Sequence, residues 1–371
     1  ASNNMEIVAQ NKNDFKNVVL RIPDGTTIVK SSAFAKCNWI NTVYIPEGVV
    51  QIEELAFKCC ENLEMIHFPS TLLEIGACAF LGCSKLNNLQ LKNVHTIGPK
   101  AFGSCLNLEN VDMPHVAVIQ DFAFYMCKNL DTVTNTDNVQ KIGNEAFAHT
   151  GENVFIEFHE PLVYIGTGAF KYSGIHCVIL YKSVNLQTLG IAAFQNCENL
   201  MGVGFAPKTK MKILPQKMFR NCHNLTEFDI PKGIVYVSPA AFENSAIQKV
   251  TFPDSLKHVA RRAFHNCSQL RTPILSVKVT VDPSAFLGCR PTSAFEMSST
   301  TIQMDVSDKM CSICLNSCER EDNICRFGCS HVFHTECAKG WYDKANTCAN
   351  CRQEVKKVEL VERPVKRRRI V

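Results

Sequence analysis

The sequence lacks any apolar run that approaches the roughly 18 residues a membrane-spanning helix needs. Its opening residues, ASNNMEIVAQNKNDF, contain no basic stretch followed by an apolar one, which is the pattern of a secretory signal. We therefore expect neither secretion nor membrane insertion. Free cysteines persist in reducing compartments, so we expect the chain in the cytoplasm, the nucleus or both.

A surplus of charge is also nearly absent, since the 371 residues carry a formal net charge of +4. Residues 353–371 hold seven Lys or Arg against three Glu, so this tail accounts for the +4 and the remainder is neutral. A body that binds nucleic acid usually has a basic surplus of its own, so the neutral remainder argues against a nucleic-acid partner.

Cysteine, by contrast, is abundant, and its distribution divides the chain. Twelve of the 20 cysteines lie between Cys37 and Cys289, and the other eight are packed between Cys311 and Cys351. A polar stretch separates the two sets. This change of density predicts a domain boundary within residues 296–308.

A phenylalanine, usually preceded by alanine, recurs every 22 to 25 residues over the first part of the chain. Five positions before each one stands an aliphatic residue, and three positions after it stands cysteine in nine of the twelve repeats. A short alternating run that ends in proline follows in many repeats and is typical of a strand closed by a breaker. The phenylalanines are Phe34, Phe57, Phe80, Phe102, Phe124, Phe147, Phe170, Phe194, Phe219, Phe242, Phe264 and Phe286.

A unit of this length cannot bury its apolar side alone, so neighbouring units must stack and share one core. We predict a solenoid of about 12 coils, each with a short strand and an irregular or short helical return that holds the Ala-Phe pair. The step from Phe194 to Phe219 is longer than the others, and we expect local bulges there.

The recurring pattern aliphatic-Gly-x-x-Ala-Phe-x-x-Cys-x-x-Leu resembles the BspA-like branch of the leucine-rich repeats. The resemblance covers residues 20–295, and residues 1–19 would form a cap or a partly disordered start. It implies a protein-binding scaffold without catalysis.

The cysteine that follows each phenylalanine forms a column in such a stack. Stacked equivalents lie about 5 Å apart, so disulfides are geometrically allowed. Thr150, Ser173 and Ser245 replace the cysteine in three coils, which indicates that the position requires a small side chain. We favour buried, reduced cysteines that act as small hydrophobic residues.

The second cysteine set has the spacing of metal ligands. Four close pairs follow one another, with 14 residues after the first, two after the second and ten after the third. Six thiols and two imidazoles suit two tetrahedral Zn²⁺ ions, and a segment of some 45 residues needs such a staple to fold. The pairs are Cys311 with Cys314, Cys329 with His331, His334 with Cys337, and Cys348 with Cys351.

Two alternatives stay open on the residues alone. Cys318 and Cys325 are left over, and either is a possible replacement for Cys329 as a ligand. A thiol enzyme would use Cys337 or Cys351 as nucleophile and His334 as base, but it leaves six ligand-type residues without a role.

The ligand order of three cysteines, two histidines and three cysteines resembles a RING finger of the two-histidine subtype over residues 309–354, a small α+β zinc fold. In that family the pairs interleave as a cross-brace. The resemblance implies one zinc on Cys311, Cys314, His334 and Cys337, and a second on Cys329, His331, Cys348 and Cys351.

RING fingers hold a ubiquitin-charged conjugating enzyme beside a substrate, and three positions here match the family. Ile313 and Trp341 correspond to its apolar contacts with the conjugating enzyme, although both could instead pack the small core. Arg352 matches the linchpin that bridges ubiquitin and the conjugating enzyme, with no covalent intermediate. Ala349 departs from the family's usual proline, which helps shape the surface that meets the conjugating enzyme.

The tail, residues 355–371, carries a basic cluster formed by Lys366, Arg367, Arg368 and Arg369. This cluster is a candidate nuclear signal, with a solvated charged end as the alternative. Residues 354–361 could form a strand that supports a RING homodimer, as happens in the family.

The whole sequence is therefore interpreted as a RING-type ubiquitin ligase. Its solenoid would bind an unidentified protein substrate on the strand-lined concave face, and its finger would recruit the conjugating enzyme and ubiquitin. A non-enzymatic scaffold with the finger as an assembly module is the alternative. The sequence is compatible with a protist source or with a large virus.

Overall fold

The computed structural model describes residues 18–290 except 153–154, 207–208, 274 and 277. Outside this range it describes five short strands by their backbone, and the side chain of Phe333. No helix within the described part is long and apolar enough to cross a membrane.

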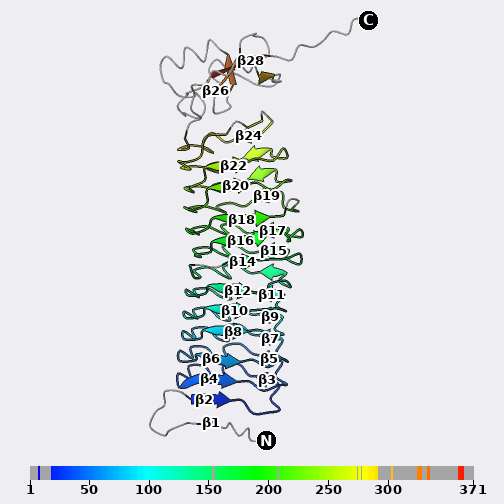
Figure 1. Ribbon diagram of the computed structural model, residues 1–371, viewed down its shortest axis with the longest axis vertical. Coiled ribbons are helices and arrows are strands. Elements are labelled where there is room, and N and C mark those ends of the chain that lie inside the picture. Colours follow the sequence, from blue (N-terminus) through cyan, green and yellow to red (C-terminus); the bar gives the residue numbers. More distant parts are fainter. Residues whose placement is uncertain are drawn as a thin grey trace, which may run out of the picture.

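The first eleven coils of residues 18–290 each begin with a strand, and these strands stack in parallel on one side of a column, the broad-strand face (Figure 1). Their residues alternate between buried and exposed, as expected for a sheet with one face on the core. The ladder is interrupted between β6 and β8 and between β18 and β20. The strands are β2 (Val18–Arg21), β4 (Ile40–Tyr44), β6 (Met65–His67), β8 (Asn88–Gln90), β10 (Asn110–Asp112), β12 (Thr132–Thr134), β14 (Phe155–Glu157), β16 (Cys177–Leu180), β18 (Gly202–Phe205), β20 (Glu227–Asp229) and β22 (Lys249–Thr251); β1 (Ile7–Val8) pairs with β2 in antiparallel fashion.

A second parallel ladder, which the sequence did not predict, is formed by two-residue strands. The second residue of each is the aliphatic residue five positions before the repeat phenylalanine, which explains why that position is invariably apolar. The strands are β3 (Ile28–Val29), β5 (Gln51–Ile52), β7 (Glu74–Ile75), β9 (Thr96–Ile97), β11 (Val118–Ile119), β13 (Lys141–Ile142), β15 (Tyr164–Ile165), β17 (Thr188–Leu189), β19 (Ile213–Leu214), β21 (Tyr236–Val237), β23 (His258–Val259) and β24 (Thr280–Val281).

The return of each coil is a run of turns, so of the two predicted forms the irregular one is correct. Residues two before and two after the phenylalanine adopt left-handed backbone angles, as Leu55 (φ 60°) and Cys59 (φ 56°) do around Phe57. Hydrogen bonds between coils hold these turns, since the Phe57 N–H donates to the Ala79 carbonyl at 2.7 Å. The surrounding ladder therefore imposes a conformation that non-glycine residues disfavour by themselves.

The repeat phenylalanines form a single column through the core. Eleven successive ring pairs join the twelve rings, with centroids 4.7 to 5.7 Å apart. Ten of these rings, from Phe57 to Phe264, are 0–1% exposed. This continuous core confirms the predicted solenoid of stacked coils.

The cysteines of this region are all free, as predicted, but the thiols do more than fill space. The Cys60 thiol donates to the Phe34 carbonyl of the preceding coil at 3.0 Å, and the pattern repeats at Cys127 and Phe102 at 3.1 Å. Burial raises the pKa of Cys60 and of Cys127 to about 12. These thiols are therefore protonated and unreactive at neutral pH.

Past residue 290 the structure describes one four-stranded sheet, in the order β25-β28-β26-β27. β26 and β27 form an antiparallel pair, and β28 pairs with β26 in antiparallel and with β25 in parallel fashion. A strand was predicted at residues 354–361, and β28 is that strand, shifted slightly along the chain. The strands are β25 (Ile302–Gln303), β26 (Ile324–Phe327), β27 (Val332–His334) and β28 (Val358–Glu362).

Candidate functional site

Most of the predicted finger residues lie outside the described residues, so their arrangement stays a prediction. No group of three or more possible metal-ligating side chains occurs in the part of the chain that is described. For His334 only the backbone is described, at the end of β27. The predicted residues outside are Cys311, Ile313, Cys314, Cys329, His331, Cys337, Trp341, Cys348, Cys351, Arg352, Lys366, Arg367, Arg368 and Arg369.

The strand pair β26–β27 brackets one predicted ligand pair along the chain. Cys329 and His331 stand between the two strands in sequence, and His334 ends the second. The Phe333 side chain, beside His334, is fully buried. Two predicted ligand pairs are thus connected through one short hairpin.

On the described surface of the solenoid, the narrow ladder of two-residue strands is interrupted between the coils of Phe194 and Phe219, and the broad ladder is interrupted in the following half-turn, between the coils of Phe219 and Phe242. One sheet ends at β18 and another begins at β20, while the narrow ladder ends at β17 and restarts at β19. The return stays joined, because the Phe194 N–H donates to the Met218 carbonyl at 3.1 Å. The two rings stack at 5.7 Å, the widest spacing in the column. The described strands show interrupted ladders at this long repeat instead of the expected local bulges, and the one register shift among the described strand pairs lies between Val18 and Val19.

Pro215 accounts for the break in the narrow ladder. In the preceding coil the Gly190 N–H donates to the Ile165 carbonyl at 2.8 Å, but Pro215 occupies the corresponding place in the next coil. Proline has no N–H, so it cannot make this bond to Leu189. The break in the broad ladder lies beside β20, whose buried middle residue is Phe228, where β16 and β18 carry valine.

A depression of about 970 Å³, the joint groove, lies over this interruption and crosses β16, β18, β20 and β22. Gly202 and Gly204 occupy the outward positions of β18, so no side chain fills the space above that strand. A Cβ atom at Gly202 would meet nothing within 4 Å, whereas one at Gly204 would come within 2.6 Å of the Tyr181 ring. Tyr181, which is 60% exposed, therefore forms one wall.

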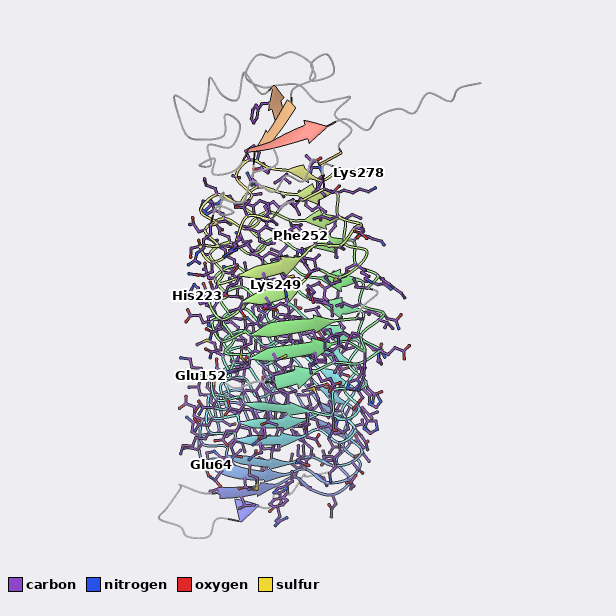
Figure 2. The ribbon with its side chains drawn as sticks, turned by 45° about the horizontal axis from the view of Figure 1, so that its top comes forward. Glu64, Glu152, His223, Lys249, Phe252 and Lys278 are labelled. Carbon is purple, nitrogen blue, oxygen red and sulfur yellow. The ribbon has the colours of Figure 1, made fainter. Side chains whose placement is uncertain are left out.

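The opposite wall of the joint groove is charged. Glu227, Asp229 and Asp254 line it together with Lys232. Glu227 lies 4.0 Å from the exposed Lys249 ammonium, which is labelled on the broad-strand face in Figure 2. Neither Asp229 nor Asp254 has a side-chain hydrogen bond or ion pair within the described structure. The wall thus offers two free carboxylates beside an apolar floor.

Sequence reasoning missed this groove. The available signal was the segment Gly202-Val-Gly204-Phe205, which places glycine at both outward positions of a strand. It was not decisive, because glycine in a strand also marks a bulge or a close backbone approach.

Comparisons with known proteins agree with both parts of the chain. The family model described as a BspA type leucine rich repeat region (6 copies) matches residues 10–118, 95–214 and 205–311. The model described as a ring finger domain matches residues 309–352.

The curated E3 ligase relatives resemble the finger region of the chain. The E3 ubiquitin-protein ligase RNF181 of Rattus norvegicus is 34% identical over 56 residues, which are 15% of this chain and 34% of the relative. The Danio rerio protein of the same name is 38% identical over 45 residues, or 12% and 29%. The chain thus spans about a third of these relatives.

Solved structures match the solenoid at low identity. A leucine-rich repeat protein from Bacteroides ovatus is 18% identical, with a TM-score of 0.38 over 73% of this chain and 96% of the other. The pneumococcal vaccine antigen PcpA is 14% identical, with a TM-score of 0.42 over 74% and 82%.

Proposed function

Because this chain belongs to the BspA-type leucine-rich repeat family and carries a ring finger domain, we propose that it is a RING-type E3 ubiquitin ligase. The solenoid would bind a protein substrate, and the finger would bring a ubiquitin-charged conjugating enzyme to it. The observation that carries the proposal is the finger itself, whose 309–352 segment resembles the corresponding part of named E3 ligases.

The finger would depend on two Zn²⁺ ions. Its eight candidate ligands are six thiols and two imidazoles, a donor set that suits tetrahedral zinc. Interleaved binding would place Cys311, Cys314, His334 and Cys337 on one ion and Cys329, His331, Cys348 and Cys351 on the other. Bound zinc supplies folding free energy in such a small module, so its part in the activity is structural.

Three residues would serve the conjugating enzyme. Ile313 and Trp341 would contribute apolar contacts, because a large aromatic side chain beside a small metal core is suited to anchor a partner. Arg352 would donate to carbonyl groups of both ubiquitin and the conjugating enzyme and so hold the thioester in position for attack. The rate gain would come from positioning, and the acceptor would be a substrate lysine.

A non-enzymatic scaffold is the second candidate, and Ala349 is the observation that favours it. The RING family usually has proline at this place, where it shapes the surface that meets the conjugating enzyme. A finger without that proline could retain its metal-bound fold and act only as an assembly contact. Homodimerisation through the finger is compatible with either function, although β28 already pairs with two strands of its own chain.

A self-ubiquitination assay with a broad panel of conjugating enzymes separates the two functions. Wild type should form zinc-dependent ubiquitin conjugates with at least one enzyme. Ile313→Ala should abolish them by weakening recruitment, and Arg352→Ala should reduce them while recruitment persists. Arg352→Lys is the matched control, and it should not restore activity because a lysine ammonium lacks the planar fork of donors. Absence of conjugates with every enzyme would favour the scaffold.

A further inference from the structure

We infer that the joint groove captures an extended segment of a partner protein in which a large apolar side chain is flanked by Lys or Arg. This inference rests on the proposed function only in assigning that segment to the ubiquitination substrate. It specifies which part of a long solenoid makes the contact and which chemistry is recognised.

The shape of the groove favours a chain segment over a small molecule. The groove crosses four successive broad strands, β16 to β22. At roughly 4.8 Å between neighbouring strands, that corresponds to a path of about 15 Å, the length of four or five extended residues. A volume of about 970 Å³ in an open depression also lies at the upper limit for enclosed small-molecule sites.

The apolar floor favours one large side chain in the middle of that segment. The outward faces of the flanking strands carry side chains, whereas Gly202 and Gly204 leave the space above β18 unfilled. Tyr181 stands beside this space, and Phe205 and Phe228 line it from β18 and β20. An aromatic or long aliphatic side chain placed here would be buried against ring surfaces, as central anchor residues of interfaces are.

The charged wall favours basic residues beside the apolar one. Three carboxylates and one ammonium line the groove, and two of the carboxylates, Asp229 and Asp254, have no partner in the described structure. In an extended segment, residues two positions apart point to the same side. A basic residue two places from the apolar anchor would therefore face the same wall of the groove.

The groove also lies over a break in the broad ladder. Apart from a second break between β6 and β8, the other broad strands up to β18 form sheets whose backbone groups are paired between coils, with exposed side chains on their outer faces. Between β18 and β20 the described residues show no strand pairing, and the coils are joined there by the pairing of β19 with β21, by the return turns and by ring contacts such as Phe205 with Phe228 at 6.0 Å.

The test uses the full chain and a fluorescein-labelled ten-residue peptide with one central Phe and a Lys two positions to each side, on a Gly-Ser background. Fluorescence anisotropy should give saturable binding. Replacing the Phe of the peptide by Ala, or both Lys by Glu, should weaken binding by more than about tenfold.

Gly202→Phe is the blocking variant, because its Cβ enters open space at an ordinary backbone angle and the fold should tolerate it. It should weaken peptide binding by more than about tenfold. Thr132→Phe is the matched control, since it adds the same ring at an exposed outward position of the same register, three broad strands away. It should leave binding unchanged.

A charge exchange tests recognition separately from sterics. Asp229→Lys combined with Asp254→Lys should weaken the Lys peptide about tenfold and should restore binding of the Glu peptide. Equal binding by wild type and Gly202→Phe, or no binding by either, would overturn the inference. Tighter groove-dependent binding of a peptide of residues 362–371 would also overturn it, because the occupant would then be the chain's own tail.

Failure of this inference is distinguishable from failure of the proposed function. Self-ubiquitination requires the finger and not the groove, so Gly202→Phe should conjugate ubiquitin to itself at the wild-type rate. If wild type binds the peptide but forms no ubiquitin conjugates, peptide capture by the groove is supported and ligase activity is refuted. If wild type forms conjugates but shows no groove-dependent peptide binding, ligase activity is supported and peptide capture is refuted.

Discussion

The strongest prediction concerns the loss of stability when a phenylalanine at the centre of the column is truncated. Phe124 is fully buried, and its ring stacks on Phe102 at 5.5 Å and on Phe147 at 5.2 Å. Phe124→Ala removes both stacks and leaves a cavity shared by three coils. Phe286→Ala is the matched control at the end of the column, where the ring is 5% exposed and has one stacked neighbour, Phe264, within the described residues.

The expected magnitudes differ because the core is continuous. Truncating a buried phenylalanine costs about 3–5 kcal/mol when the surroundings cannot collapse. For an array of this size, that corresponds to a fall of roughly 6–20 °C in melting temperature. The terminal variant should lose roughly half as much, since each repeat depends on its nearest neighbours.

Hydrogen exchange measured by mass spectrometry locates the effect. In Phe124→Ala, faster exchange should extend through several coils on both sides of the substitution, whereas in Phe286→Ala it should stay in the last coils. Equal losses of stability in the two variants, or faster exchange confined to the coil of Phe124, would refute the reasoning that one shared core holds the solenoid together.

Three further predictions concern the thiols and the finger. Cys105→Ser should lower the melting temperature measured by calorimetry by only a few degrees, because a hydroxyl can replace the thiol that donates to the Phe80 carbonyl at 3.3 Å. Cys105→Val removes that donor and should lower the free energy of unfolding by about 1–3 kcal/mol. Burial raises the pKa of the Cys60 and Cys127 thiols to about 12 in the folded state, whereas in the unfolded chain a cysteine has a pKa of about 8.5. Below about pH 8.5 these thiols are protonated in both states, so their contribution to stability is fully present there. Melting temperatures should therefore fall as pH rises from there towards 12, and less steeply in a Cys60→Ser, Cys127→Ser double variant; identical slopes would contradict this. A zinc chelator should remove exchange protection from residues 309–354 and leave the solenoid protected, and loss in both regions would mean that the two parts do not fold independently.

The sequence predicted the features that repeat. The column of phenylalanines and the aliphatic residue before each follow from spacing, and the reduced state of the cysteines follows from the small residues that replace some of them, Thr150, Ser173 and Ser245. They could be predicted because each position meets the same neighbours in every coil, so one environment is sampled many times.

The features that depend on neighbouring coils could not be read from the sequence. Left-handed angles at residues such as Leu55 have no residue signature, because hydrogen bonds between coils impose them. The thiol bond from Cys60 to the Phe34 carbonyl is invisible for the same reason. The joint groove results from the missing side chains of Gly202 and Gly204, and its depth depends on the side chains beside them.

The account depends most on the metal content of the finger, and elemental analysis of the purified full chain measures it directly. The proposed ligand set predicts two zinc ions per chain, with the cysteines of residues 309–354 protected from alkylation until a chelator is added. Markedly fewer than two ions, with those thiols reactive from the start, would contradict the finger and with it the proposed recruitment of a conjugating enzyme.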